Sequence, residues 1–516
     1  MLLDAVVATS GQVASTRSRL AKRAAIASLL RRAMDEGPED VEIAVHYLGG
    51  ELRQRRTGVG WAGLSGLPEP AVAPSLTLSE VDAAFARIAA LGGPGSAAAR
   101  SGAVGELFAC ATAAEQAFLR GLVSGGLRQG ALDAVVLDAV AEAADVPQAA
   151  VRRAAMLAGA GAPVARAALT GGREALAAIG LRVGRPVRPM LASTAPDVAA
   201  ALAKLTGDAG ARVCADAKLD GVRIQCHRDG GDVAVFTRSL DEITARLPEV
   251  VAAVRALPAE RLILDGEAML VGADGRPRPF QETASLAASE TPAGAALRPY
   301  FFDALHIDGE DLIDLPLAAR LDRLDALVPA ERRVARVRDA TPEAVAAFFA
   351  RVVEEGQEGV VLKDLAAPYE AGRRGAAWVK VKPRHTLDLV VLAVEWGNGR
   401  REGWLSNIHL GARDPEGGGF VMLGKTFKGM TDEMLAWQTE RFLALERSRS
   451  RHVVRLRPEQ VVEIAFDSLQ RSRRYPGGLA LRFARVLRYR DDKSADEADT
   501  IATVRAIAGG AAGSED

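Results

Sequence analysis

The stretch Ala215-Asp216-Ala217-Lys218-Leu219-Asp220-Gly221-Val222-Arg223 decides how the centre of this chain folds. A short, mostly apolar segment runs into the lysine, and the Asp-Gly pair behind it is typical of a turn. Apolar and polar side chains then alternate over residues 222–227, and this period of two predicts a β-strand. The turn Asp229-Gly230-Gly231-Asp232 reverses the chain, and the alternation resumes after it. We therefore expect a short strand, a tight turn that carries Lys218, and then a hairpin that turns at residues 229–232.

The Lys-x-Asp-Gly-x-Arg pattern places three kinds of functional group close together. The lysine amine is a nucleophile, Asp220 and Gly221 shape its turn, and Arg223 is suited to meeting an anion. Our hypothesis is that Lys218 attacks the α-phosphate of a nucleotide and carries the nucleotide covalently. A pattern this short also arises by chance, so the rest of the chain has to support the hypothesis.

Length and composition are those of a globular protein with several domains. The 516 residues predict two to four domains, and 49% apolar and 25% charged residues fall in the globular range. We see no run of 18 apolar residues and no export signal, so we expect no membrane contact and a cytoplasmic, nucleoid-associated protein. Cys110, Cys214 and Cys226 form neither a zinc pattern nor a disulfide framework, which fits a reducing compartment.

Two runs of basic residues stand out in a chain whose net charge is only −1. Residues 10–33 hold six basic side chains and residues 471–490 hold seven arginines, in both cases without an acid. Such runs are either solvated faces of a helix or strand, or contacts to phosphates. We predict DNA contacts from both runs and from the glycine-bounded loop 125–130. The residues predicted to make them are Arg17, Lys22, Arg128, Arg482 and Arg485.

The predicted fold is multidomain, and its parts differ in their patterns. Residues 1–183 show helical spacing of Ala and Leu, which predicts an all-α domain. Its clearest helix starts are the capping boxes Thr77/Glu80 and Thr112/Glu115. Two prolines in segment 184–189 exclude a continuous helix and begin a second domain, residues 184–386. This domain is predicted to be α+β with antiparallel sheets, and Thr194 is predicted to cap its first helix.

Residues 387–516 are predicted to form a β-barrel of the OB type with a frayed C-terminal tail. Five short strands are expected, with a helix over 432–445 between the third and the fourth, and this order matches such a barrel. The last strand is expected over 482–487. OB barrels commonly bind nucleic-acid backbones. We expect residues 384–388 to act as a hinge between the second and third domains.

Further candidate residues lie on the strands that follow the lysine turn. Glu267 ends an apolar strand, where a carboxylate needs a cation or a metal as its partner, and Phe302 is able to stack on a base. One of Phe301 and Phe302 is expected to pack in the core. Only nine of the 65 basic residues are lysines, so lysine marks candidate functional positions. Lys380 and Lys382 share one strand face and are expected to flank an anion.

Together, the ordered motifs resemble those of covalent nucleotidyltransferases and, more narrowly, of ATP-dependent DNA ligases of the bacterial or archaeal kind. The motifs are, in order, Lys218-Leu219-Asp220-Gly221-Val222-Arg223, Thr237-Arg238-Ser239, Asp265-Gly266-Glu267, Phe302-Asp303, Glu358-Gly359-Val360-Val361-Leu362-Lys363, Trp378-Val379-Lys380-Val381-Lys382, Arg482-Phe483-Ala484-Arg485 and Asp492-Lys493. Each motif is weak alone, but their order is highly specific and the resemblance covers nearly the whole chain. Two positions depart from the family pattern: Asp216, where many relatives have Glu, and Ala484, where many have Pro.

The resemblance implies that residues 1–183 form a DNA-binding domain. It also implies ATP and Mg²⁺ as cofactors and nicked double-stranded DNA as the partner of a monomer that encircles it. Lys218 would be the catalytic nucleophile and would carry AMP, which passes to a DNA 5′-phosphate before a 3′-hydroxyl displaces it. The implied ATP-binding residues are Asp216, Arg223, Arg238, Glu267, Phe302, Arg374, Lys380, Lys382, Asp492 and Lys493. The implied metal ligands are Glu358 and Glu267.

Other interpretations stay open at this point. An mRNA-capping guanylyltransferase or an RNA ligase shares Lys-x-Asp-Gly, although the long helical N-terminal domain and the Arg-x-x-Arg…Asp-Lys ending favour a DNA ligase. The zinc cysteines of a nicotinamide-dependent DNA ligase are missing. A non-catalytic DNA-binding scaffold would leave Lys218 and the carboxylates unexplained.

Overall fold

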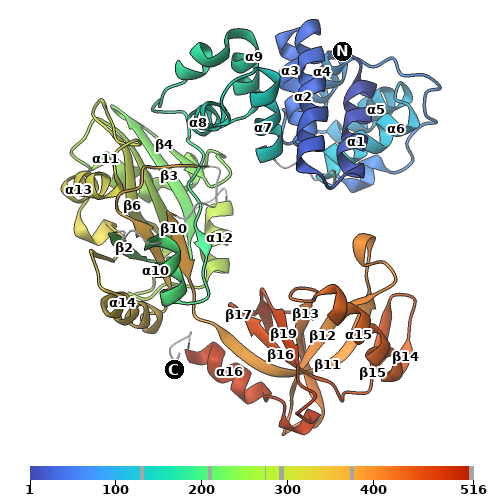
Figure 1. Ribbon diagram of the computed structural model, residues 1–516, viewed down its shortest axis with the longest axis vertical. Helices are drawn as coiled ribbons and strands as arrows, with labels where there is room; N and C mark the ends of the chain where they lie inside the picture. The colour runs from blue at the N-terminus through green and yellow to red at the C-terminus, as the bar shows by residue number, and fades with distance from the viewer. Residues whose placement is uncertain (128–132, 207–211, 274, 290–295, 372–376, 511–516) are drawn as a thin grey trace. The chain divides into compact units, whose positions relative to one another are not determined.

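The computed structural model describes residues 1–127, 133–206, 212–273, 275–289, 296–371 and 377–510. Packing of the Cα atoms divides the chain into two compact units. The first unit comprises Met1–Thr194, Leu202–Thr341 and Val361–Val379. The second comprises Ala195–Ala201, Pro342–Val360 and Lys380–Asp516. Figure 1 traces the chain from the blue N-terminal helices through green and yellow sheets to orange and red strands.

The N-terminal part of the first unit is helical, as predicted (Figure 1). Its helices are α1 (Leu3–Ser15), α2 (Arg19–Glu36), α3 (Pro38–Leu48), α4 (Leu78–Ala90), α5 (Ser96–Ala109), α6 (Ala113–Ser124), α7 (Asp133–Ala143), α8 (Gln148–Ala158) and α9 (Ala162–Ala177). Both predicted capping boxes are present, at the starts of α4 and α6. One continuous apolar core packs these helices together, which explains why their Ala-rich faces are stable.

The basic run of residues 10–33 lies mainly on α2, and the neighbouring α7 supplies the acids that the run itself lacks. Arg19 donates to Asp138 Oδ2 at 2.8 Å, and Arg23 pairs with Glu142. Arg31 donates to the main-chain oxygen of Glu142 at 2.7 Å. Three of the six basic residues therefore bind α7. For these three, the sequence indicated a solvated face or a phosphate contact, but the structure shows contacts between two helices.

Two five-stranded sheets form the middle of the chain, which is α+β as predicted. Their strand orders are β1-β10-β9-β2-β8 and β4-β3-β5-β6-β7, and the second sheet is antiparallel throughout. The strands are β1 (Ser193–Thr194), β2 (Val213–Ala217), β3 (Val222–Asp229), β4 (Asp232–Thr237), β5 (Arg261–Leu270), β6 (Leu297–Ile307), β7 (Glu310–Asp311), β8 (Arg336–Arg338), β9 (Val360–Asp364) and β10 (Trp378–Val381). The helices are α10 (Val198–Thr206), α11 (Pro248–Arg255), α12 (Phe280–Ala288), α13 (Leu317–Leu327) and α14 (Pro342–Glu354).

The lysine turn connects two strands, as predicted, but it does not itself close a hairpin; the predicted hairpin is formed by β3 and β4. Strand β2 before the turn belongs to one sheet and strand β3 after it belongs to the other, so the chain crosses between sheets at Lys218. Strand β3 pairs instead with β5 and, through the predicted turn Asp229–Asp232, with β4. Alternation in the sequence identifies strands but not their partners, because pairing depends on contacts that are distant in the chain.

The polar face of β3 is covered by the proline-rich boundary segment. Arg223, Gln225 and His227 bind, in this order, the backbone of Met190, Val187 and Gly184, at distances of 2.7 to 3.0 Å. These side chains follow the period of two, so one strand face holds the segment along its length. The boundary segment is therefore irregular but fixed.

The first helix after this segment begins later than predicted. Thr194 belongs to β1, and α10 starts at Val198. The carboxylate of Asp197 caps that helix by accepting the Ala200 N–H at 2.7 Å. Asp and Thr are both good caps, so the local sequence did not distinguish them.

The C-terminal part of the second unit contains a seven-stranded sheet (Figure 1). Its strands run in the order β13-β12-β11-β15-β14, with β16 pairing both β11 and β19, while β17 and β18 form a separate pair. The elements are β11 (His385–Trp396), β12 (Leu405–Arg413), β13 (Phe420–Thr426), α15 (Asp432–Ala444), β14 (Glu446–Arg449), β15 (Val453–Leu456), β16 (Val461–Phe466), β17 (Ser468–Arg471), β18 (Leu479–Arg482), β19 (Arg485–Tyr489) and α16 (Ile501–Gly510). The predicted helix and first four strands are present.

Several predictions for this part need correction. The single strand expected over 482–487 is split, because Phe483 adopts a φ of 57°, a conformation that a bulky residue rarely takes. The short strands β14, β15 and β17 were not predicted. Residues 385–388 of the expected hinge lie inside β11 and pair with β16. The tail forms α16, which buries Ile501 and Val504, and the end predicted to fray lies outside the described residues.

None of the helices that the structure describes combines the length and the apolar content needed to cross a membrane.

Candidate active site

Lys218 lies in the turn between β2 and β3. It is half-buried, and its Nζ is 3.4 Å from the Leu219 carbonyl oxygen. Gly221 packs so closely on β5 that an added Cβ would lie 2.4 Å from the Ala268 carbonyl oxygen. Only glycine fits there, so the turn holds the lysine against the second sheet.

A carboxylate of β5 is electrostatically coupled to this turn. Glu267 accepts a backbone hydrogen bond from Gly221. Burial raises the pKa of Glu267 to about 7, against the lowering effects of Lys218 and Arg223. A group with such a pKa is charged or neutral depending on small changes around it, a property common in active sites.

Arg223 makes a bidentate ion pair with Asp265. Its Nε lies 3.0 Å from Oδ1 and its Nη2 2.6 Å from Oδ2. The Tyr369 hydroxyl donates to Asp265 Oδ2 at 2.7 Å and accepts the Met190 N–H at 3.0 Å. Burial alone would lower the pKa of Arg223, but Asp265 holds it above its ordinary range. The site therefore contains a permanently charged guanidinium in a fixed position.

A second bidentate pair lies in the same sheet. Arg320 of α13 donates to both oxygens of Asp303, at 2.8 and 3.0 Å, and neither side chain is exposed. Arg320 Nη1 also donates to the carbonyls of Leu315 and Ala367, at 2.6 and 3.1 Å. Its donors are thus used within the protein, and the pair is structural.

Two aromatic rings border Arg223. Phe302 and Trp378 meet edge to face with their centroids 6.0 Å apart, and the Arg223 guanidinium lies 5.3 and 5.8 Å from these centroids. Lys363 Nζ lies 4.6 and 4.3 Å from the same centroids. Phe301 is only 1% exposed and belongs to the core, which confirms that one of the two adjacent phenylalanines packs there.

Asp216 is buried and held by two cations. Lys363 Nζ is 2.6 Å from its Oδ2, and Arg336 Nε is 3.3 Å from its Oδ1. Burial would raise the pKa of Asp216, but Lys363 and Arg336 hold it below its ordinary value. Asp216 therefore fixes Lys363, the ammonium that contacts both rings.

Lys380, Lys382 and Glu358 belong to the second unit. Val379 and Val381 are buried and Lys380 is half-buried, as the predicted alternation requires. Lys382 pairs with Glu358, and this pairing outweighs the effect of burial and raises the pKa of Lys382. Lys382 is thus held in its charged form.

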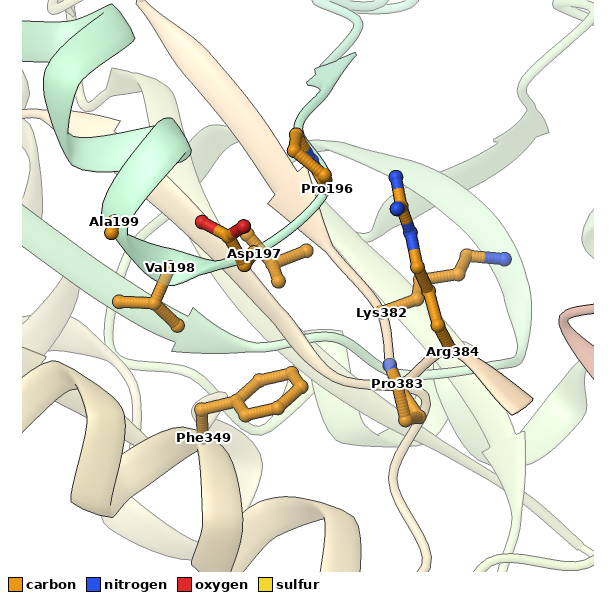
Figure 2. Close-up of a pocket in the computed structure, with 9 residues that line it drawn as sticks. Pro196, Asp197, Val198, Ala199, Phe349, Lys382, Pro383 and Arg384 are labelled. Atoms are coloured by element: carbon orange, nitrogen blue, oxygen red, sulfur yellow. The ribbon is translucent and has the colours of Figure 1, made fainter. Parts of the chain in front are cut away.

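An open hollow of about 360 Å³ adjoins Lys382. Figure 2 shows that Lys382 and Arg384 extend away from Phe349, which lines the apolar side of the hollow with Val198. The nearby Asp197 is occupied as the cap of α10. The hollow itself therefore offers few polar groups to a ligand.

The predicted residues Asp492 and Lys493 join one charge network after β19. Arg490 binds Asp492 through two hydrogen bonds of 2.8 and 2.7 Å, which lower the pKa of Asp492 to about 2. Lys493 Nζ donates to Asp388 Oδ2 at 2.6 Å, and Arg490 Nη1 donates to the same oxygen at 2.9 Å.

The predicted site residues fall into distinct groups. Within the first unit, Lys218, Glu267, Arg223, Asp216 and Phe302 are connected by the contacts above, and Arg238 is exposed just after β4. Of the predicted DNA contacts, Arg17 and Arg485 are exposed and Lys22 and Arg482 are half-buried. Arg128 and Arg374 lie outside the described residues.

Sequence reasoning gave no role to four residues that shape the site: Asp265, Lys363, Tyr369 and Trp378. Three of them lie inside the quoted motifs, next to residues that were chosen, so the signal was present. Tyr369 stands in a loop without a repeating pattern, and only its contacts reveal it.

An amine beside a carboxylate and a fixed cation is suited to covalent chemistry on an anion, and flat rings beside that cation suit a base. The fold and the site thus indicate an enzyme that acts on nucleotides.

Comparisons with known proteins narrow this class. Three family models match: "ATP dependent DNA ligase domain" over residues 189–382, "ATP dependent DNA ligase C terminal region" over 401–493 and "DNA ligase N terminus" over 64–141. A "Probable DNA ligase" of Beutenbergia cavernae is 68% identical over 517 residues, covering 99% of this chain and 100% of the relative. A "Probable DNA ligase" of Nocardioides sp. is 64% identical over 511 residues, covering 99% of each. This chain belongs to the ATP-dependent DNA ligase family.

A solved structure shows the same fold. The chain named "Pmar-Lig_Pre." superposes with a TM-score of 0.62 at 19% identity, covering 94% of this chain and 99% of that chain. The likeness extends over the helical and the sheet-containing parts together, because almost all of both chains is covered.

Proposed function

We propose that this enzyme uses ATP to seal nicks in double-stranded DNA that carry a 3′-hydroxyl and a 5′-phosphate. The position of Lys218 carries the proposal: it lies where the chain crosses between two sheets, electrostatically coupled to Glu267, in a chain of this family. Lys218 Nζ attacks the α-phosphorus of ATP, a P–N bond forms, the amine loses a proton and pyrophosphate leaves. A DNA 5′-phosphate oxygen then attacks that phosphorus and breaks the P–N bond. Finally the 3′-hydroxyl attacks the DNA phosphorus and AMP leaves.

The base is proposed to stack on the ring of Phe302. This ring is half-buried and meets the buried Trp378 edge to face, so Trp378 fixes its orientation. Asp216 contributes by fixing Lys363. The residues proposed to contact sugar or phosphate oxygens are Arg223, Arg238, Arg374 and Glu267.

The transferred phosphate is proposed to be neutralised by Lys380 and Lys382. Preorganised cations stabilise charge that develops in a phosphoryl-transfer step. Asp492 and Lys493 are proposed to orient the leaving pyrophosphate during the first step.

Glu358 and Glu267 are proposed to hold Mg²⁺. Hard carboxylate oxygens suit this ion, which often binds one or two protein carboxylates together with phosphates and water. The described residues contain no group of three candidate ligands, which is compatible with such a site. Glu358 pairs with Lys382, which places this carboxylate beside a cation that is proposed to meet the transferred phosphate. When bound, Mg²⁺ neutralises negative charge on the phosphate oxygens. Glu358 and Lys382 hold each other in position through their ion pair.

The C-terminal strands are proposed to form an OB-type barrel that contacts DNA. The branching of the sheet at β11, which pairs β12, β15 and β16, supports a curved sheet of this kind. Phe483 is 54% exposed, and Lys428 Nζ and the Arg482 guanidinium lie 5.3 and 5.4 Å from its ring centroid. An exposed ring among cations suits nucleic-acid binding. We further propose that domains 1–183, 184–386 and 387–516 act as one monomer that encircles DNA.

The test is transfer of label from α-labelled ATP or GTP to the protein in the presence of Mg²⁺. We expect label from ATP on the wild type and on Lys204→Ala, which changes an exposed lysine of α10, and none on Lys218→Ala. Nicked DNA should discharge the label. Label from GTP would indicate capping chemistry, and no label even after pretreatment with pyrophosphate would contradict the proposal.

A further inference from the structure

Asp388 of β11 holds two cations with a single oxygen atom. Its Oδ2 accepts from Lys493 Nζ at 2.6 Å and from Arg490 Nη1 at 2.9 Å. The carboxylate is largely covered, with a side-chain exposure of 12%. Its other oxygen, Oδ1, is also buried and has no hydrogen-bond partner among the described residues. A buried polar atom without a partner is unfavourable, so this carboxylate needs an explanation.

The carboxylate is not needed to attach the loop that follows β19. The main chain of Asp388 already binds Asp499 beyond that loop. The Asp388 N–H donates to Asp499 Oδ2 and the Asp499 N–H donates to the Asp388 carbonyl, both at 2.8 Å. At the other end of the loop, the Arg490 N–H donates to the Val461 carbonyl at 2.9 Å. Both loop ends are thus held by backbone bonds, and the side chain of Asp388 is left for the cations.

The two cations depend on Asp388 to different degrees. Arg490 is also held by Asp492 through two hydrogen bonds. For Lys493, Asp388 is the one carboxylate that forms an ion pair with it in the described residues. A lysine side chain loses much rotamer freedom when it binds an anion, and fixing it beforehand reduces that loss. One of the three ammonium donors is used by Asp388, which leaves two for a ligand.

We propose that Asp388 is a positioning residue that holds the Lys493 ammonium beside Arg490, so that both cations meet the pyrophosphate group of the nucleotide together. The inference rests on the proposed role of Lys493 in the first step. Asp388 touches no substrate and acts through Lys493.

The experiment compares two steps of the reaction in the full-length protein. We expect Asp388→Asn to lower the rate constant of enzyme adenylation at saturating ATP and Mg²⁺ by about tenfold. Sealing of a pre-adenylated nick, from which no pyrophosphate leaves, should change less than about twofold. An equal loss in both steps would indicate a structural role and overturn the proposal. An unchanged or faster adenylation would overturn it too.

A matched control lies directly opposite on β16. Glu463 is the register partner of Asp388 and pairs with Arg488 at 2.6 Å. Glu463→Gln removes a carboxylate from the same sheet without touching Lys493, and both steps should keep wild-type rates. Asp388→Glu restores the charge and should recover part of the adenylation rate. If Asp388→Asn does not fold, the two steps are compared between Asp388→Glu and the wild type instead.

A double variant separates this inference from the function on which it rests. If Asp388 acts through Lys493, adding Asp388→Asn to Lys493→Ala should slow adenylation no further. If Lys493→Ala adenylates at the wild-type rate, the proposed role of Lys493 fails. If Lys493→Ala is slow but Asp388→Asn is not, only the role of Asp388 fails.

Discussion

The two buried Asp–Arg pairs of the second sheet have the same chemistry and different surroundings. Asp265 and Asp303 are opposite each other in the register of β5 and β6, and each binds an arginine through two hydrogen bonds. Arg320 and Asp303 are both 0% exposed, whereas Arg223 is 15% exposed. Arg320 reaches main-chain carbonyls with its remaining donors, and Arg223 borders the rings of the site.

The difference teaches that a bidentate pair alone does not indicate function. The Asp303–Arg320 pair is closed on all sides and contributes to the fold by satisfying buried groups. The Asp265–Arg223 pair is open on one side. There the carboxylate of Asp265 fixes a guanidinium that a ligand is able to contact. The two pairs differ in whether the space beside the guanidinium is accessible. Variants of Arg320, Arg223 and Tyr369 test this distinction.

Breaking the closed pair should give the largest effect. Arg320→Met leaves the fully buried Asp303 without its partner, which we expect to lower the free energy of unfolding by about 4 kcal/mol. Denaturant unfolding followed by circular dichroism measures the change. Adding Asp303→Asn should recover part of the loss, because the isolated charge is then removed. A loss below about 1 kcal/mol would show that the pair is not closed.

Breaking the open pair should affect activity more than stability. We expect Arg223→Met to lower the adenylation rate by about 100-fold, since an interaction with the substrate is lost. The free energy of unfolding should fall by less than in Arg320→Met, because Asp265 keeps the hydrogen bond from Tyr369. Arg228→Met, on the same strand, serves as the control, and rapid-quench labelling gives the rate. Equal activity of the two variants would remove Arg223 from the site.

Removing the hydroxyl that supports the open pair should have a smaller effect. Tyr369→Phe leaves the Met190 N–H without its acceptor and Asp265 without one donor. We expect the free energy of unfolding to fall by about 1–2 kcal/mol, the usual effect of leaving a buried group unpaired. The adenylation rate should fall several-fold, because Asp265 then holds Arg223 less firmly. A loss of stability without a loss of activity would show that Tyr369 supports the fold but does not influence the site.

At neutral pH the smallest effect concerns an uncharged residue on the same face of β3 as Arg223. Burial lowers the pKa of His227 to about 3, below the 6.5 of an unfolded chain. The unfolded state therefore binds a proton first, so stability is complete above pH 6.5 and declines as the pH falls from 6.5 towards 3.

The measurement for His227 is the free energy of unfolding at several pH values. His227→Gln should flatten the decline below pH 6.5 by up to about 1.4 kcal/mol per pH unit. At pH 8, where His227 is neutral in both states, pH should no longer change the difference between the variant and the wild type. An unchanged slope between pH 6.5 and 4 would mean that His227 is not buried in its neutral form.

The sequence predicted more of the site than of its surroundings. The structure brings together the motif residues Lys218, Arg223, Glu267 and Phe302, of which Lys218 lies in a turn and the others on strands. Their roles stay predictions. The partners Asp265 and Lys363 lie inside the same motifs but were given no role, and Tyr369 stands in a loop without a repeating pattern.

Charge runs were the least informative part of the sequence. The run on α2 lacks acids over 24 residues, yet Asp138 and Glu142 of α7 neutralise part of it. The C-terminal run behaves alike, because Arg488 and Arg490 bind Glu463 and Asp388 from other strands. Ion pairs form between residues that are close in space but distant in the chain. A basic run that contains no acidic residue can therefore still lie beside acidic residues in the folded protein.

By itself, the sequence determined the helical character of the N-terminal part and the position of the main strands that follow, and it placed Lys218 at a strand end with a glycine behind it. These properties follow from local periodicity, capping and the steric demands of a turn, which are encoded within a few residues. The tertiary structure alone decided that β2 and β3 enter different sheets, that the polar face of β3 is covered by the segment before it, and that one Asp–Arg pair is closed and the other open. Those outcomes depend on contacts between residues far apart in the chain, whose free energies no local pattern records.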